Sequence, residues 1–295
     1  MLPLGEICAL LAPLAWSVAV ILFKQSDGAP ALSLNLFKNV AGVGLLGLTM
    51  LVLGIGIPLD RSLSDWVRLG TSGLIGLALA DTLLFEGLRR VGAARLAVVD
   101  TIYAPLLVFL AWAVLGEPIS RSFLIGALAV VVGVTIATVQ RGVFAGIEGR
   151  DRAIGMLYCL GAIGGTAVGI VIAKPALAAS NLVELTCTRL LFGLAGQTAW
   201  ITLARQWPVA RVAFRPQPLW RSLIPAAILG PYVSLLLWLG GFKWAPASLA
   251  AMLNQMATVY ILVLARVVLK EQLSGRQVAG ATIAAGGAVW IVWST

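Results

Sequence analysis

The sequence predicts an all-α integral membrane protein in which ten transmembrane helices form two inverted five-helix repeats. Three observations lead to this fold: the composition, a series of long apolar runs and an internal repeat. Of the 295 residues, 60% are hydrophobic and 11% are charged, whereas soluble globular proteins carry roughly 45–50% apolar and about 25% charged residues. Most of the chain is therefore expected to lie in a lipid bilayer.

Apolar runs long enough to cross a bilayer recur along the whole chain. A helix needs about 20 mostly apolar residues to span the hydrocarbon core. Backbone groups in lipid must be satisfied within the segment, and these runs are too long and too non-alternating for barrel strands. The predicted helices lie at 4–23, 32–53, 67–88, 93–115, 122–140, 153–173, 182–203, 221–241, 246–268 and 275–293.

The chain also repeats itself. Laying residues 76–137 over residues 230–291 needs no gap, and the earlier parts of the two halves align less tightly. The matched pairs are Gly76 with Gly230, Gly87 with Gly241, Glu117 with Glu271, Ser120 with Ser274, Gly126 with Gly280, Gly133 with Gly287, Lys24 with Lys174 and Lys38 with Arg189. We expect two five-helix repeats, at 1–142 and 150–295.

An odd number of crossings in each half has a geometric consequence. The second half must enter the membrane from the opposite side, which gives an inverted repeat with a pseudo-two-fold axis in the membrane plane. Secondary transporters have this architecture, with the substrate site near the midplane where the halves meet. A duplicated structural or assembly protein is the alternative.

Several motifs resemble those of a known family. The ten-helix plan, the turn "GLRRVGAARLAVV" into the fourth helix, Pro105, and the blocks "LGEPIS" and "LKEQLS" with two later glycines each are similar to the EamA family of the drug/metabolite transporter superfamily. The resemblance covers nearly the whole chain. It implies export or exchange of small metabolites, amino acids among them, by alternating access around a central cavity, and we expect a bacterial plasma (inner) membrane.

The composition excludes other classes of function. The net charge is +9, but the arginines fall mostly in predicted loops that flank a membrane, so no nucleic acid partner is needed. The chain has no histidine, and Cys8, Cys159 and Cys187 show no metal-ligand or redox spacing. No nucleotide-binding motif G-x-x-x-x-G-K-S/T occurs. We expect no catalytic residue, metal or cofactor, which disfavours an intramembrane enzyme.

Acidic and amide side chains inside predicted helices are the first candidate site residues, because charge at a helix centre costs about 2.5–3.5 kcal/mol and usually faces a cavity or a partner. Asp81, whose counterpart is Leu235, is interpreted as a cavity carboxylate for substrate binding and coupling that takes an ammonium group or a proton. A structural pair with Lys38 is the alternative.

Asp100 and Thr101 align with Asn254 and Gln255, and Tyr103 follows on nearly the same helix face as Asp100. We expect all five near the central site, with helix–helix hydrogen bonding as the alternative.

Basic residues and aromatic rings complete the set of candidates. Lys38 and Arg189, with Glu184 near the start of the same helix as Arg189, are interpreted as gating, coupling or inter-helix pairing residues. Direct contact of Lys38 and Arg189 with the substrate is the alternative. Lys24 and Lys174 are expected to snorkel to headgroups. Four aromatic side chains are expected to line the substrate cavity: Trp16, Phe85, Tyr158 and Trp238. Glu117 and Glu271 are interpreted as residues that maintain the fold.

The basic residues and the family resemblance predict opposite orientations. Loops after the first, third, fifth, seventh and ninth helices collect most of the arginines, and the positive-inside rule then places the termini outside the cytoplasm. The resemblance implies cytoplasmic termini. An even number of crossings puts both termini on one side in either case.

The leading hypothesis is a secondary carrier. Its expected partners are a small-molecule substrate, membrane lipid and a coupled proton, with substrate exchange as the alternative driving force. A membrane channel or a scaffold subunit without carrier activity is the alternative function. A channel would need pore-lining rings from several helices or subunits, whereas a paired repeat favours one central site.

Overall fold

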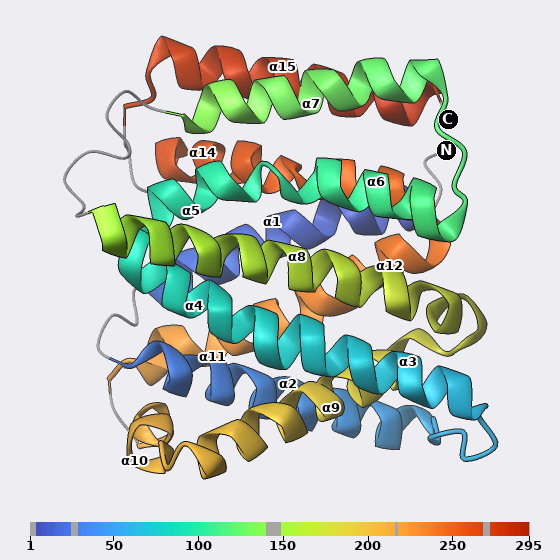
Figure 1. Cartoon of the computed structure of the whole chain (residues 1–295), viewed down its shortest axis with the longest axis vertical. Helices are drawn as coiled ribbons and strands as arrows, with labels where there is room; N and C mark the ends of the chain where they lie inside the picture. Colours follow the sequence, from blue (N-terminus) through green and yellow to red (C-terminus); the bar gives the residue numbers. More distant parts are fainter. Residues whose placement is uncertain (1–3, 25–28, 140–148, 216–217, 268–271, 295) are drawn as a thin grey trace.

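The computed structural model describes the chain except residues 1–3, 25–28, 140–148, 216–217, 268–271 and 295, and all regular elements in this part are helices (Figure 1). The first half contains α1 (Leu4–Lys24), α2 (Ala31–Leu53), α3 (Leu63–Gly73), η1 (Leu74–Leu79), α4 (Ala80–Val91), α5 (Ala93–Asp100), α6 (Tyr103–Leu115) and α7 (Arg121–Thr138). The second contains α8 (Gly149–Ala179), α9 (Leu182–Leu203), α10 (Trp207–Ala210), η2 (Val212–Phe214), α11 (Trp220–Ile228), η3 (Leu229–Ser234), α12 (Leu235–Trp244), α13 (Ala247–Asn254), α14 (Met256–Val267) and α15 (Gly275–Ser294).

These elements form the membrane fold that the sequence predicts. Nine segments of the described chain are long and apolar enough to span a bilayer. The tenth crossing is α9, which has 22 residues and carries Glu184, Arg189 and Gln197. All three side chains are buried, so they lower the hydropathy of α9 without placing a charge in lipid. Both termini lie at the same side of the molecule, on the right of Figure 1.

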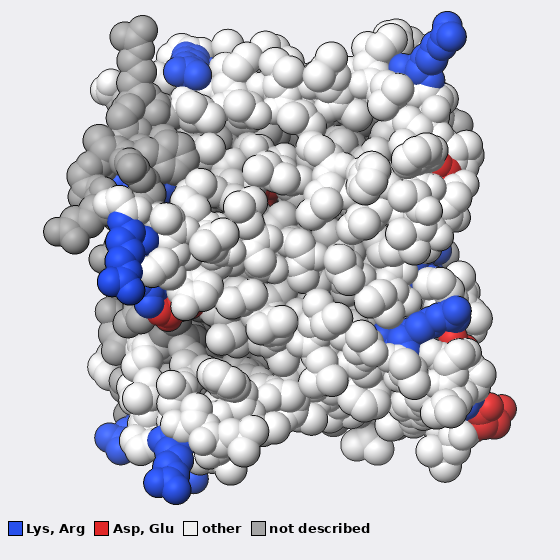
Figure 2. All heavy atoms as spheres, in the orientation of Figure 1, with Lys and Arg blue, Asp and Glu red and all other residues white. Residues whose placement is uncertain are grey.

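The lateral surface is suited to lipid. Figure 2 shows lysine and arginine side chains near the two ends of the helices, whereas the middle of the visible face is almost free of charge. Large apolar side chains are exposed along the crossings, among them Leu51, Phe109 and Leu128. Because apolar side chains on a bilayer-facing surface need no protein partner, this distribution fits an integral membrane protein.

Equivalent helices of the two halves pack against each other through glycine. A Cβ added to Gly126 would lie 3.0 Å from the carbonyl oxygen of Gly287, and one added to Gly133 would lie 2.6 Å from that of Gly280. Gly126 and Gly280 are counterparts in the repeat, as are Gly133 and Gly287, so the two contacts are related by the pseudo-two-fold. Because the earlier glycine of α7 meets the later glycine of α15 and the reverse, the two helices run antiparallel, as an inverted repeat requires.

We expect substitution at this helix contact to be strongly destabilising. In Gly287→Val, a Cβ would lie 2.8 Å from both the Gly126 carbonyl oxygen and the Val130 amide nitrogen, and backbone atoms cannot move aside as a flexible side chain can. Overpacking typically costs about 1–3 kcal/mol, and we expect at least the upper value. The neighbouring Gly286→Val is the matched control, because a Cβ there meets no atom within 4 Å. Thermal unfolding in detergent compares them, and equal melting temperatures would contradict the contact.

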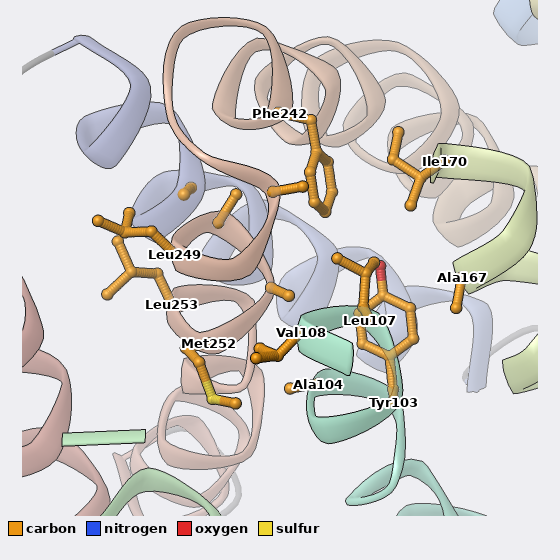
Figure 3. Close-up of a cluster of buried hydrophobic side chains, with 14 of the residues drawn as sticks. Tyr103, Ala104, Leu107, Val108, Ala167, Ile170, Phe242, Leu249, Met252 and Leu253 are labelled. Atoms are coloured by element: carbon orange, nitrogen blue, oxygen red, sulfur yellow. The ribbon is translucent and has the colours of Figure 1, made fainter. Parts of the chain in front are cut away.

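The apolar core lies where the two halves meet. Figure 3 shows side chains of α6, α8, α12 and α13 converging, with Tyr103 and Leu107 opposite Phe242 and Ile170. Small residues such as Ala104 and Ala167 let the helix backbones approach closely, which is how helices associate in lipid. The lower end of this core, at Tyr103, borders the central cavity described below.

Four crossings are not continuous α-helices, which the sequence did not predict. The third and eighth crossings contain the π-helical turns η1 and η3 at nearly equivalent positions of the repeat. The fourth crossing breaks between α5 and α6 at residues 101–102, and the ninth breaks between α13 and α14 at Gln255. π-Turns occur frequently at functional sites, and discontinuous helices form the midplane sites of many transporters.

Candidate functional site

A cavity of about 270 Å³ lies between the two halves, next to all four interruptions. It borders both predicted halves, and most of its lining is apolar. The side chains or backbones that line it belong to Ala12, Pro13, Trp16, Lys38, Asn39, Gly76, Leu77, Asp81, Leu84, Asp100, Tyr103, Ala162, Ile163, Thr166, Arg189, Leu190, Gly230, Pro231, Ser234, Leu235, Trp238, Asn254, Gln255 and Ala257.

The lining follows the internal repeat closely. All but two of these residues form counterpart pairs: Ala12 with Ala162, Pro13 with Ile163, Trp16 with Thr166, Lys38 with Arg189, Asn39 with Leu190, Gly76 with Gly230, Leu77 with Pro231, Asp81 with Leu235, Leu84 with Trp238, Asp100 with Asn254 and Tyr103 with Ala257. Ser234 and Gln255 line it without their counterparts. The cavity therefore lies on the pseudo-two-fold axis, where inverted-repeat transporters bind substrate.

Lys38 and Asp81 meet at the wall of the cavity. The Lys38 Nζ donates to Asp81 Oδ2 at 2.8 Å, and the two side chains are 9% and 16% exposed. The structure thus shows the structural pair that the sequence left as the alternative, and it shows that this pair lines the cavity. Because the Asp81 carboxylate lies in the cavity wall, a ligand cation or a proton can compete with Lys38 for it.

Asp100 is the second acid of the cavity. It is the last residue of α5, it is exposed although it lies inside a crossing, and no ion pair to it occurs within the described chain. The Gln255 amide Nε2 donates to the backbone carbonyl of Asp100 at 3.3 Å, which joins the two helix breaks across the axis. The Tyr103 hydroxyl and both amide atoms of Asn254 are buried without a hydrogen-bond partner in the described chain.

Arg189 is the counterpart of Lys38, and it is 1% exposed. Its Nε donates to the Ser72 hydroxyl at 2.7 Å, and its guanidinium lies 5.6 Å from the centre of the Trp238 ring. The Ser72 hydroxyl donates in turn to the Gly169 carbonyl at 2.5 Å, which fixes its position. A Cβ at Gly76 would lie 2.9 Å from Arg189 Nη2, so glycine leaves room for the guanidinium. Within the described residues, Nη1 and Nη2 have no hydrogen-bond partner.

Three of the expected site residues that the structure describes, Thr101, Tyr158 and Glu184, are not part of the cavity lining. The Thr101 hydroxyl donates to the Val98 carbonyl at 2.8 Å, within its own helix turn. Tyr158 lies under the Arg90 guanidinium at 5.4 Å, and Glu184 lies near the start of α9. The side chain of Phe85 lies outside the described residues. Leu84 and Thr166, which were not predicted, line the cavity. They could have been found from the repeat, because their counterparts Trp238 and Trp16 were candidate site residues.

A charged network lies at the side that holds both termini, called here the terminus side. Glu117 accepts from the backbone amides of Ala247 and Ser248 at 2.6 and 3.0 Å and from the Ser248 hydroxyl at 2.7 Å. These amides begin α13, where free donors and the helix dipole favour a carboxylate. This geometry agrees with the prediction that Glu117 maintains the fold. Its repeat counterpart Glu271, for which the same role was predicted, lies outside the described residues.

Two lysines cap each other's helices in the same network. Lys174 of α8 donates to the carbonyls of Phe242 and Ala245 at the end of α12. Lys243 of α12 donates to the carbonyls of Leu177, Ala178 and Ser180 at the end of α8, at 2.8, 3.1 and 2.7 Å. A cation at a helix C-terminus satisfies carbonyls that lack amide partners. Lys174 therefore does not snorkel to headgroups, while the side chain of Lys24 lies outside the described residues.

Arg61 and Glu184 complete the network. Arg61 binds both carboxylate oxygens of Glu184, at 3.0 and 2.6 Å, and the Ser180 hydroxyl at 3.1 Å. The Arg61 and Glu184 side chains are 5% and 1% exposed. Together with Glu117 and the two lysines, this pair links connections 54–62, 116–120, 180–181 and 245–246, all on the terminus side. The network ties these four connections to one another.

Comparison with known proteins agrees with this architecture. The model of the EamA-like transporter family matches residues 3–139 and again residues 153–293. A solved structure described as "Crystal structure of protein" is 20% identical, with a TM-score of 0.78, and the match covers 97% of this chain and 95% of that chain. This likeness shows the fold alone. None of the curated proteins matches the chain.

Proposed function

Because the chain belongs to the EamA-like transporter family, whose members are transporters rather than enzymes, we propose that it is a secondary active transporter of small metabolites such as amino acids. It works as an exporter or exchanger in a bacterial plasma membrane, by alternating access around the central cavity. The single observation that supports this proposal best is the cavity on the pseudo-two-fold axis, with counterpart residues of both halves in its wall.

The position of the closed network supports alternating access. We propose that Arg61, Glu184, Glu117 and the two lysine caps close the terminus side in this conformation. Asp100, which lines the cavity, is exposed. Asp100 ends α5, which enters from the side opposite the termini. We propose that the cavity communicates with that opposite side here, and that the network opens when the cavity turns to the terminus side.

Counterflow in proteoliposomes tests the carrier. Vesicles that contain the purified protein are loaded with a high concentration of an unlabelled amino acid, and uptake of the same labelled compound is followed for each of the twenty common L-amino acids. A carrier shows transient accumulation driven by the trans compound, at a rate that saturates. Flux without trans-stimulation would instead indicate a channel, and no protein-dependent flux of any amino acid would reject amino acid transport.

A further inference from the structure

The geometry points to a carboxylate subsite at the two guanidinium nitrogens of Arg189 that have no hydrogen-bond partner in the described chain, in a cavity that takes a zwitterion with its cationic nitrogen at Asp100. This inference rests on the proposed function and names the chemistry of its substrate. It also gives Arg189 the direct substrate contact that the sequence left as the alternative to gating or helix pairing. The supporting observations are the fixed guanidinium, its missing internal partner and the charges around it.

Arg189 is held in place before any ligand arrives. Ser72 binds Nε and Trp238 covers one face of the guanidinium, while the edge formed by Nη1 and Nη2 is buried and has no hydrogen-bond partner in the described chain. That edge presents two parallel N–H donors, the arrangement that binds a carboxylate through both oxygens. A buried cation with unsatisfied donors is costly, so a ligand carboxylate would remove a penalty that the free protein bears.

The internal repeat explains why Arg189 has no carboxylate partner within the described chain. In the first half, Lys38 pairs with Asp81 at 2.8 Å. In the second half, the counterpart of Lys38 is Arg189, and the counterpart of Asp81 is Leu235, which lines the same cavity as Arg189. The second half therefore keeps the cation and replaces its carboxylate with an apolar side chain. The ligand supplies the missing carboxylate.

The charges of the cavity favour a zwitterion over a simple anion. Lys38 and Arg189 balance Asp81 and Asp100, so the four formal charges cancel. A zwitterion keeps this balance, because its carboxylate meets Arg189 while its ammonium meets the unpaired Asp100. Tyr103 lines the same cavity as Asp100 and Arg189, and its hydroxyl, which has no hydrogen-bond partner in the described chain, is a further polar group for such a ligand. A dianion such as a phosphate monoester would leave two uncompensated charges in a site of low dielectric.

The experiment uses ligands that share one carbon skeleton. Binding of each of the twenty common L-amino acids to the purified protein is measured first by thermal shift, since a ligand of the native state raises apparent stability. For each amino acid that binds, the decarboxylated amine and the deaminated acid are then measured by calorimetry. We expect the amino acid to bind at least about tenfold tighter than either analogue, as the loss of one charge-assisted hydrogen-bond pair implies.

Two variants separate the subsite from a structural role of Arg189. In Arg189→Gln, affinity for the amino acid should fall at least about tenfold while affinity for the amine stays unchanged, and Arg189→Lys should restore part of the loss. Leu235→Asp supplies Arg189 with a carboxylate from the chain itself, as Asp81 does for Lys38. We expect this variant to melt at a higher temperature than the wild type and yet to lose amino acid binding, a combination that damage to the fold does not produce.

The outcomes distinguish this inference from the proposed function. Equal weakening of amino acid and amine by Arg189→Gln, or unchanged amino acid binding in Leu235→Asp, would overturn the carboxylate subsite. Failure of all twenty amino acids to bind would overturn the zwitterion. If the amines or the acids alone were bound and showed counterflow, the zwitterion would be wrong and the carrier would stand. If amino acids bound without counterflow, the subsite would stand and the carrier would be wrong.

Discussion

Asp81→Asn is expected to abolish counterflow while the protein stays folded. Asparagine has nearly the same shape as aspartate, but it cannot compensate the charge of Lys38, whose Nζ lies 2.8 Å from the carboxylate. Lys38 would then lose the carboxylate that balances its charge in the cavity wall, where the cation repels a substrate ammonium, and position 81 could no longer exchange a proton. We expect counterflow to fall at least roughly 100-fold, which corresponds to about 2.7 kcal/mol of lost transition-state stabilisation.

The stability of the same variant separates function from folding. Loss of one partner of a buried hydrogen bond costs about 1–3 kcal/mol, and the exposure of the Asp81 side chain, 16%, favours the lower end. Glu86→Gln is the matched control, because Glu86 lies on the same helix α4 and pairs with Arg90 at 3.3 Å outside the cavity. It should retain wild-type counterflow. Wild-type counterflow and an unchanged pH dependence in Asp81→Asn would remove this residue from the mechanism.

Glu184→Gln is expected to have the largest effect on stability. Arg61 binds Glu184 through both carboxylate oxygens, and both side chains are almost fully buried. Removing one partner of a buried ion pair typically costs about 3–5 kcal/mol, because the other charge stays buried without compensation. The double variant Arg61→Gln with Glu184→Gln removes both charges and should be more stable than Glu184→Gln alone.

Denaturant titration in mixed micelles measures both effects. The free energy of unfolding is compared for the wild type, the two single variants and the double variant, which forms a double-mutant cycle. Asp65→Asn is the control, because the Asp65 pair with Arg68 is partly exposed at 3.1 Å and such pairs contribute at most about 1 kcal/mol. Additive costs in the cycle would show that the contact between Arg61 and Glu184 does not stabilise the fold.

The fold could be predicted from the sequence, because the lengths of the apolar runs and the internal repeat can be recognised without knowledge of tertiary contacts. The alignment of Asp100 with Asn254 placed both near one depth, and both line the cavity. The sequence also named Lys38 as the structural alternative partner of Asp81, because a buried charge has few compatible neighbours.

Other features depend on contacts that no local pattern encodes. The break before α6 had one signal, Pro105, which lacks an amide hydrogen and lies in the first turn of α6. The equivalent break at Gln255 has no proline. The role of Arg189 depends on Ser72, which is distant in sequence, and Lys174 reaches carbonyls of α12 that become free only because that helix ends beside it.

Access to the cavity from each side of the membrane tests the central claim most directly. Cys8, Cys159 and Cys187 are free and buried, so they are replaced, and Thr166→Cys then places one thiol in the cavity wall. Proteoliposomes of known orientation are treated with a membrane-impermeant thiol reagent added to one side at a time. We predict labelling only from the side opposite the termini at rest, and from the terminus side as well once a counterflow substrate is added. Labelling from both sides without substrate, or from neither side during counterflow, would contradict an alternating cavity between the two halves.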